Sequence, residues 1–510
     1  MKYTSLFYLT LFLPLTLLAY QLCPQRHRWV VLLTASYFFY FMASLTLILY
    51  LWASTLCVYA VGLGMGRCDP LTHGRKRLLV WIGVGVHLAL LAVLKYGPFI
   101  AGVANDVLAL WPAAPHLPVF KLAVPAGLSF FSLQAISYLA DIYQGRTKAD
   151  TNLGRVALYM AFFPTIIEGP ICRYEPTAAA LYAGQPLNHH DIAYGSQLLC
   201  WGLFKKMVIA DRLSPLVNNL FKNPAESGGV LAVLAAVACT IQLYADFSGC
   251  IDISIGTAQM FGITLPQNFR QPFFSTTVTE FWRRWHITLG TWLKDYIFFP
   301  LSMSPRIKAL GRRAKQRHGR RFGQIIQAII PLLAVWMANG IWHGAGWNYL
   351  FFGAYYFVLV MLGLIFEQPL ETLAARLHID RKAWPWRALQ MVKMAVIVLV
   401  GELMFRASDV ASGLAMLRSI FTGWDWKMLT DGTLLQHGIY GNDYMVLLAA
   451  GVIMLAVDIC HEAGISLRDW AARLRLPIRW TLYVTLILLV VIFGAYGEGY
   501  QPVDPLYANF

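Results

Sequence analysis

The sequence predicts an all-α protein that crosses a membrane many times. Of its 510 residues, 58% are hydrophobic and only 13% are charged, whereas soluble domains carry about 25% charged residues. Apolar runs near the roughly 20 residues that a spanning helix needs recur along the whole chain. They leave no room for a sizeable soluble domain, so residues 1–510 are expected to form a single polytopic domain. This composition excludes a disordered chain and a soluble cytosolic protein.

Thirteen apolar runs are candidates for spanning helices, within the room for about 10 to 14 spans that the chain length gives. They cover residues 5–22, 29–43, 44–64, 78–96, 119–140, 156–172, 192–210, 230–262, 322–341, 347–366, 388–405, 444–462 and 480–496. The first run follows Lys2 without a small-x-small cleavage pattern, which predicts an uncleaved helix. The runs 29–43 and 44–64 lie between basic clusters, which predicts a hairpin entered and left from the cytoplasm and an N-terminus outside.

Basic residues exceed acidic ones, giving a net charge of +15. Segment 302–322 alone contributes Arg306, Lys308, Arg312, Arg313, Lys315, Arg317, Arg320 and Arg321. Because Lys and Arg accumulate in cytoplasmic loops, this segment is expected to be a basic cytoplasmic loop facing lipid, and no nucleic-acid partner is needed. Direct contact with a phosphate-bearing ligand is the alternative. The tail 497–510 carries only Glu498 and Asp504 and is expected to be extracytoplasmic.

Residues 266–305 are rich in aromatic side chains but too polar for a lipid-exposed span. They are expected to lie at the membrane interface or to dip back into the protein, where polar groups find partners. The eight cysteines show no Cys-x-x-Cys and no zinc-type spacing, so we expect no metal site. The run Gly62, Gly64 and Gly66 follows no soluble strand and indicates helix packing or a helix end rather than nucleotide binding.

His343 is the clearest candidate for chemistry, because ionisable groups among apolar runs are costly and usually functional. Imidazole exchanges a proton near neutral pH, and the neighbouring Gly344 and Gly346 would let a substrate approach the backbone. A hydrogen-bonded structural histidine is the alternative. His286 is the second candidate, with an interfacial anchor beside Trp285 as its alternative.

Three acidic residues in apolar surroundings are further candidates, with structural polar pairing as the favoured interpretation for each: Asp246, Asp252 and Glu168. The chain has no Gly-x-Ser-x-Gly and no Walker A sequence, which argues against a serine-hydrolase site within it.

Four blocks together resemble the membrane-bound O-acyltransferase (MBOAT) family, and more closely its bacterial branch that acts on polysaccharides such as alginate. They are QLYADFSGCIDISIG at 242–256, QNFRQPFFS at 267–275, FWRRWHITLGTWLKDYIFFPL at 281–301 and WHGA around His343. The resemblance implies an MBOAT-type multi-helix bundle around a central tunnel, with re-entrant or interfacial helices. His343 matches the family's catalytic histidine and His286 its second functional histidine.

The polar neighbours expected around His343 are Asn339, Trp342 and Asp246. Asn339 lies one helical turn before His343 on the same face, and Trp342 directly precedes it. The C-terminal PLYANF resembles a pattern of this branch and its partners whose tyrosine carries the acyl group, and Tyr507 is the matching position. An interfacial tyrosine in a tail is the alternative.

The resemblance implies an enzyme of the bacterial inner membrane without a permanently bound cofactor. Acetyl-CoA would be the cytosolic donor, an exported polysaccharide the final acceptor, and a separate extracytoplasmic acetyltransferase the partner. Acetylation of peptidoglycan or cellulose, or D-alanyl transfer to teichoic acid, are alternatives within the family. A transporter of polysaccharide precursors is the alternative from another class, although the internal repeats typical of transporters are not apparent.

Overall fold

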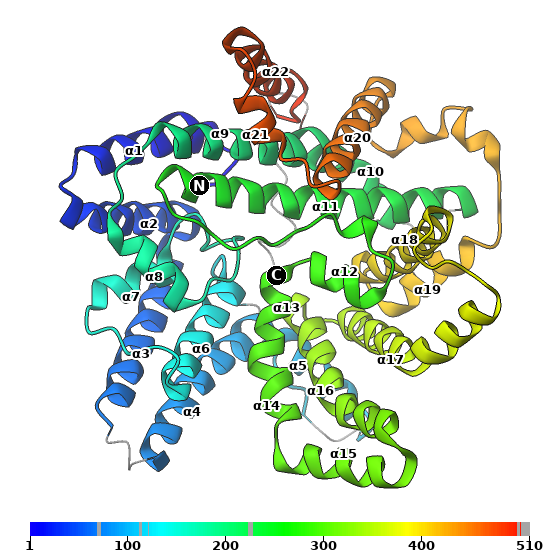
Figure 1. The fold of residues 1–510 in the computed structure, drawn as a ribbon, viewed down its shortest axis with the longest axis horizontal. Coiled ribbons are helices and arrows are strands. Elements are labelled where there is room, and N and C mark those ends of the chain that lie inside the picture. Colours follow the sequence, from blue (N-terminus) through cyan, green and yellow to red (C-terminus); the bar gives the residue numbers. More distant parts are fainter. Residues whose placement is uncertain (69–72, 112–114, 121, 223–227, 497–499, 501–510) are drawn as a thin grey trace. The chain divides into compact units, whose positions relative to one another are not determined.

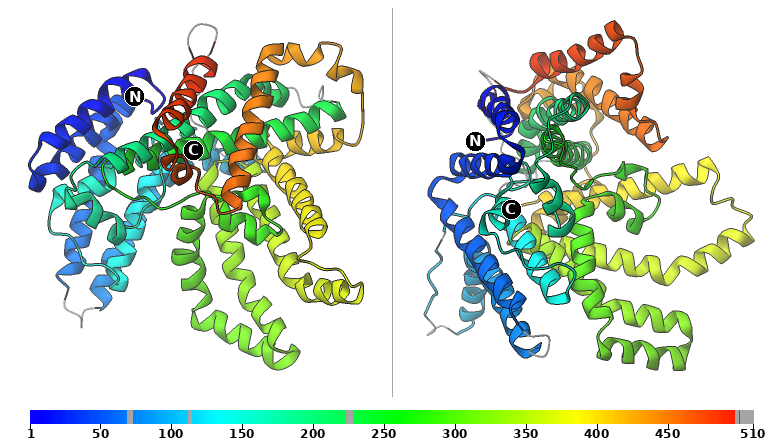
Figure 2. Two further views of the ribbon diagram at one scale, coloured as in Figure 1. Left: turned by 45° about the horizontal axis from the view of Figure 1, so that its top comes forward. Right: turned by 60° about the vertical axis from the view of Figure 1, so that its left-hand side comes forward.

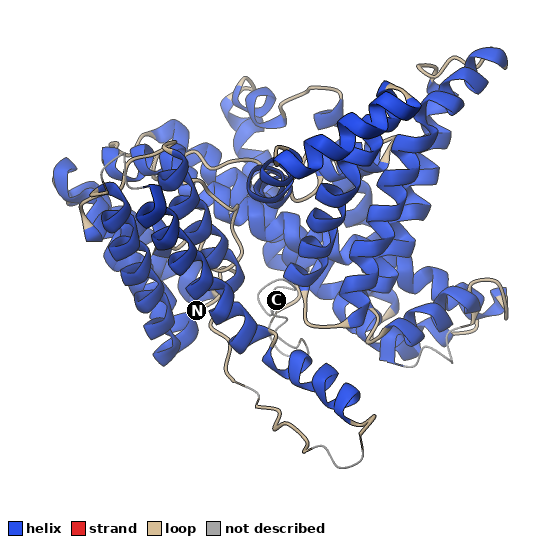
Figure 3. Ribbon diagram, turned by 90° about the horizontal axis from the view of Figure 1, so that it is seen from below, coloured by secondary structure: helices blue, strands red, loops and turns tan. Residues whose placement is uncertain are grey.

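The computed structural model describes residues 1–68, 73–111, 115–120, 122–222, 228–496 and 500. Within these ranges the chain forms helices and no strands (Figures 1 and 3), which confirms the all-α prediction. The described residues divide into two compact units. Unit 1 contains residues 1–203 and 249–266, and unit 2 contains residues 204–248 and 267–500.

Unit 1 is built mainly from the N-terminal third of the chain. Its helices are η1 (Tyr8–Phe12), α1 (Leu13–Leu22), η2 (Gln25–His27), α2 (Arg28–Ser44), η3 (Leu45–Leu47), α3 (Ile48–Gly66), α4 (His73–Leu90), η4 (Leu91–Lys95), α5 (Gly97–Leu108), α6 (Leu128–Gln144), α7 (Leu153–Ala161), α8 (Tyr174–Ala183) and α9 (His189–Leu203). Helix α6 is buried along nearly its whole length and packs against α3 and α4. The end of α11 (Gly229–Met260) also belongs to this unit.

Unit 2 contains the candidate site. Its elements are η5 (Phe204–Ala210), α10 (Asp211–Lys222), the first part of α11, η6 (Pro272–Phe274), α12 (Val278–Arg284), α13 (Ile287–Leu293), η7 (Lys294–Phe298), α14 (Phe299–Ser302), α15 (Pro305–His318), α16 (Arg320–His343), α17 (Trp347–Arg376), α18 (Trp384–Arg406), α19 (Val410–Ser419), η8 (Trp426–Leu429), η9 (Thr433–His437), α20 (Gly441–Glu462), α21 (Leu467–Ala472) and α22 (Leu476–Phe493). Figure 2 gives two further views, in which α15 lies beside the first turns of α16.

Eight helical stretches among the described residues are long and apolar enough to cross a membrane. They are Gln25–Gly66, Gly74–Lys95, Gly229–Met260, Arg320–His343, Trp347–Arg376, Trp384–Arg406, Gly441–Glu462 and Leu476–Phe493, and Tyr8–Leu22 is a shorter apolar helix. Their side chains toward the outside are largely apolar, as expected for contact with lipid. The chain is therefore a multi-pass membrane protein.

Four of the thirteen predicted runs are not among these eight stretches: 5–22, 119–140, 156–172 and 192–210. Two of them differ clearly in extent from the helices that form. Over 156–172 the structure has only the nine-residue helix α7, which ends at Ala161 because Pro164 is close behind it and Gly169–Pro170 keep the following segment irregular. Over 119–140 the helix begins only at Leu128, after Pro125 and after Gly127 at φ 72°. Both helices, α6 of 17 residues and α7 of nine, belong to unit 1 and have most of their side chains buried.

The predicted pair over 29–64 consists of two helices, as expected. Figure 1 shows α2 and α3 meeting at an open bend rather than side by side, which differs from the predicted hairpin. The bend lies at Leu45, which has a positive φ of 45°. The segment expected as a basic loop, 302–322, is largely helical and forms α15 and the start of α16.

Candidate functional site

His343 is the last residue of α16. The helix ends there because Gly344 is fully extended, and α17 begins only three residues later at Trp347. The two helices touch backbone to backbone, since a Cβ at Gly340 would lie 2.4 Å from the Tyr349 carbonyl oxygen. A Cβ at Gly344 would lie 2.1 Å from the Tyr349 ring. The glycine beside His343 therefore serves helix packing in this structure.

Aromatic side chains surround the imidazole of His343, which is 2% exposed. Its ring centroid lies 4.9 Å from that of Trp342, 5.8 Å from Phe352 on α17 and 5.2 Å from Phe405 on α18. All three contacts are edge-to-face, so the neighbouring rings fix the plane of the His343 imidazole. His343 is thus held in one orientation in a setting that excludes bulk water.

His286 is equally buried and lies where α13 begins. Its backbone has a positive φ of 46°, an uncommon conformation for a residue with a side chain. The backbone around it is held by Asn268, whose carbonyl accepts a hydrogen bond from the Ile287 N–H at 3.0 Å. The Asn268 side chain accepts from the Thr288 N–H at 3.0 Å and from the Thr288 hydroxyl at 2.8 Å. An outlying backbone conformation that its surroundings hold in place is typical of functional residues.

The hydrogen bonds of Asn268 also determine which nitrogen of His286 carries the proton. A backbone N–H can only donate, so the Asn268 atom that faces Thr288 is the carbonyl oxygen Oδ1. His286 Nδ1 lies 3.2 Å from this same oxygen and must therefore donate to it. In the neutral ring Nε2 is then the acceptor. Burial lowers the pKa of His286 to about 3, which keeps the ring neutral.

Trp342 connects the two histidines. It precedes His343 in sequence, and its ring centroid lies 5.4 Å from that of His286. Phe247 of α11 covers the other side of His286 at 4.7 Å. The structure thus brings together three of the predicted site residues, which come from α16 and the start of α13. Asn339 is buried on α16, and its amide nitrogen has no hydrogen-bond partner among the described residues.

Asp246 takes part in a buried ion pair. Its carboxylate pairs with Lys206 of the π-helix η5, and Asp211 lies 2.7 Å from the same ammonium group. Lys206 is completely buried, so the three groups form a buried ionic cluster within unit 2. This agrees with the structural-pairing interpretation of Asp246. Glu168 and Asp252 belong to unit 1, where Glu168 is fully buried.

Two buried polar residues of unit 2, Asn268 and Glu402, were missed from the sequence. Asn268 lies in a block that carried the resemblance, but its role depends on contacts with residues about 20 positions away. Glu402 is 1% exposed on α18, and its Oε2 accepts no hydrogen bond from any described residue. A carboxyl group in the apolar run 388–405 was a visible signal for Glu402.

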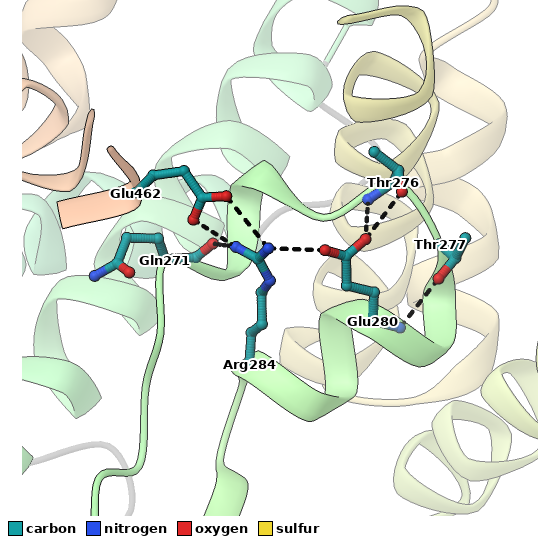
Figure 4. A network of polar contacts seen from close by, with 6 residues as sticks. All are labelled: Gln271, Thr276, Thr277, Glu280, Arg284 and Glu462. Atoms are coloured by element: carbon teal, nitrogen blue, oxygen red, sulfur yellow. Dashed lines mark hydrogen bonds and ion pairs between the residues drawn. The ribbon is translucent and has the colours of Figure 1, made fainter. Parts of the chain in front are cut away.

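An ionic network two residues before His286 anchors α12 (Figure 4). Arg284 pairs with Glu280 at 2.8 Å and with Glu462, at the end of α20, at 2.6 Å. Desolvation raises the pKa of Glu280, but hydrogen bonds from Thr276 and the charge of Arg284 outweigh it, so that its pKa lies below the usual value. The network connects α12 to α20 and so supports the backbone that leads to His286.

Tyr507 lies outside the described residues. The other site residues define a class of protein: a multi-pass membrane protein with two buried histidines arranged around one indole. Imidazoles in this setting are suited to proton transfer from a hydroxyl group to which water has little access.

Comparison with known proteins identifies the family. Residues 146–313 match the family model described as MBOAT, membrane-bound O-acyltransferase family. Two relatives named "Probable alginate O-acetylase AlgI" come from Azotobacter vinelandii and Pseudomonas aeruginosa. The first is 33% identical over 84% of this chain and 79% of its own length, and the second is 32% identical over 89% and 82%.

A third relative, "Peptidoglycan O-acetyltransferase" of Helicobacter pylori, is 32% identical over 64% of this chain and 62% of its own length. The chain belongs to the MBOAT family, as the resemblance indicated, and it is an O-acyltransferase.

Proposed function

We propose that this chain is an inner-membrane O-acetyltransferase that passes acetyl groups from cytosolic acetyl-CoA to the outside for O-acetylation of an exported polysaccharide. Alginate is the favoured polymer, because the relatives that match most of the chain are named for alginate O-acetylation. The observation that carries the chemistry is the buried contact of His343, Trp342 and His286.

Acetyl-CoA is polyanionic and does not cross hydrocarbon, so only the acetyl group needs to pass through the protein. In the proposed reaction His343 accepts the proton of an acceptor hydroxyl, because an unactivated hydroxyl is a poor nucleophile near pH 7. The oxygen attacks the thioester carbonyl, the new C–O ester bond forms and the C–S bond breaks. The proton held by His343 then passes to the leaving thiolate, which departs as the free thiol.

The negative oxygen that develops during this attack needs a hydrogen-bond donor. The neutral tautomer of His286 has an acceptor at Nε2, so it does not supply that donor. The ring of Trp342 contacts both histidines, and its indole N–H, which can only donate, is the proposed stabilising group. His286 then positions Trp342 through ring contact.

Tyr507 is the proposed first acceptor. A phenol, with a pKa of about 10, is easier to deprotonate than a sugar alcohol. Its ester also keeps a good leaving group, so the acetyl group remains transferable. A separate extracytoplasmic acetyltransferase would take the acetyl group from the tail and place it on the polymer.

Tyr507→Phe tests the carrier role. The substitution removes one oxygen and little volume, so we expect normal membrane insertion but no acetyl label on the tail and acetylation of the polymer below a tenth of the normal level. Mass spectrometry of the C-terminal peptide and acetyl analysis of secreted polymer measure both. Tyr500→Phe is the matched control, because it also removes a phenolic oxygen near the C-terminus. Normal polymer acetylation in Tyr507→Phe would refute the carrier role.

A donor assay tests the proposed activity itself. Membranes containing the chain are incubated with radiolabelled acetyl-CoA or with a carrier protein charged with radiolabelled D-alanine, and protein-bound label is counted. We expect label from acetyl-CoA at least about tenfold above membranes without the chain, and none from the D-alanyl carrier. If label came only from the D-alanyl carrier, the activity would be D-alanyl transfer and not acetyl transfer.

A further inference from the structure

We propose that the paired ends of α16 and α17 bind the headgroup of an anionic phospholipid. The two helices are antiparallel, since only residues 344–346 connect them, so the start of α16 and the end of α17 lie at the same side. A groove of about 510 Å³ lies between these ends. Two guanidinium groups, of Arg321 and Arg376, line it together with the polar side chains of Gln368 and Thr372.

A proline inside α17, Pro369, lies in the groove wall. Pro369 has no N–H, so the carbonyl of Ile365 loses its helical partner. Arg321 supplies the missing hydrogen bond by donating to the Ile365 carbonyl at 3.3 Å, and it also donates to the Leu364 carbonyl at 3.1 Å and to the side chain of Gln368. Arg321 is thereby held at the groove wall, while its positive charge is not neutralised by any of these partners.

The rest of the lining is apolar, which distinguishes the groove from a simple phosphate site. Ile365, Pro369 and Leu373 provide this part. Leu370 and Phe366 on the same stretch of α17 are 58% and 49% exposed. An anionic phospholipid has both chemistries, since its phosphate would meet the arginines while its acyl chains continue along the exposed apolar face of α17.

The neighbouring helix α15 adds positive charge. It packs on α16 through Ile307 and Gly311, and a Cβ at Gly323 would lie 2.7 Å from the Gly311 carbonyl oxygen. With this face against α16, the other face carries the basic side chains of segment 302–322, most of them exposed. Of the nearby acidic residues, Glu371 pairs with Arg381 at 2.8 Å, and neither Glu371 nor Glu367 lines the groove.

The groove is too far from the candidate site to serve as part of it. Arg321 is the second residue of α16 and His343 the last, and a 24-residue helix is about 36 Å long. This length is comparable with the hydrocarbon thickness of a bilayer, about 30 Å. Positive charge at one end of two spanning helices, next to an apolar surface, matches the leaflet that carries anionic lipids.

Native mass spectrometry of the full chain in an uncharged detergent tests the site with cardiolipin and phosphatidylcholine as probes. We expect cardiolipin to remain bound at least tenfold more tightly than phosphatidylcholine. Arg376→Gln should weaken cardiolipin binding about fivefold, and the double change with Arg321→Gln about 30-fold. Arg376→Lys keeps the charge and should bind within about twofold of the original chain.

Arg75→Gln with Arg77→Gln is the matched control, because both side chains are exposed at the start of α4 in unit 1. It removes the same charge and should leave cardiolipin binding unchanged. Since Arg321 also holds the backbone carbonyls of Leu364 and Ile365, Arg376→Gln alone decides the question if the double variant fails to fold. An equal loss of cardiolipin binding in the control would overturn the proposal and indicate general charge attraction. Displacement of cardiolipin by coenzyme A at equal concentration would also overturn it and indicate a donor site.

Discussion

His343→Ala is expected to reduce acetyl transfer from acetyl-CoA by at least about 100-fold while the protein still inserts and elutes as a single species. General-base catalysis contributes about 10²- to 10⁴-fold to such reactions. The imidazole is fixed by ring contacts with Trp342, Phe352 and Phe405, so no other described side chain can replace it without moving these rings. The rate of label transfer per folded molecule is the quantity to measure.

His87 offers a matched control for this substitution. It is also completely buried, and its ring nitrogens are held by two contacts: Nε2 lies 2.7 Å from the Ser54 hydroxyl and Nδ1 lies 2.8 Å from the Gly83 carbonyl. This is the pattern of a structural histidine. His87→Ala should therefore lower thermal stability but leave the rate per folded molecule within about twofold. If His343→Ala retained the original rate, His343 would have no part in the chemistry.

Lys206→Met is expected to destabilise the fold by about 3–5 kcal/mol, because it leaves Asp246 and Asp211 buried without their shared cation. Removing one partner of a buried ion pair is costly since the remaining charge is poorly solvated. The loss is measured as a lower melting temperature in detergent, with the fraction of protein that still elutes as a single species after heating as the readout.

Two comparisons separate this effect from a general loss of charge. Arg381→Gln breaks the exposed ion pair with Glu371 and should change stability by less than about 1 kcal/mol. Adding Asp246→Asn to Lys206→Met removes one of the stranded charges and should restore part of the lost stability. A Lys206→Met protein as stable as the Arg381→Gln protein would show that the cluster is solvated rather than buried.

The sequence predicted the class of fold well because its main signal, apolar length, is local. Interruptions were harder to predict. The run 156–172 is apolar enough to span, yet Pro164 and Gly169–Pro170 break it, and its burial inside unit 1 depends on neighbours that sequence reasoning does not supply. The run 119–140 failed for the same reason at Pro125 and Gly127.

For the candidate site, the sequence pointed to His343, His286 and Trp342, which the structure brings into contact, because polar residues stand out among apolar ones. It favoured structural pairing for Asp246 without identifying Lys206, 40 residues earlier, as the partner. Asn268 was missed since its importance depends on the tautomer of His286, which only the hydrogen-bond geometry reveals. Long-range pairing of this kind leaves no periodic pattern along the chain.

The glycine contact between α16 and α17 limits how the protein can open. A Cβ at Gly353 would lie 2.4 Å from the Trp336 carbonyl oxygen, and Gly340 is as close to the backbone of α17. Helices in such contact have no side-chain layer in which to slide or rotate past each other, so they travel as one rigid body. Any movement that admits a reactant to His343 must therefore come from rotamer changes in the surrounding rings or from displacement of α18, α12 and α13.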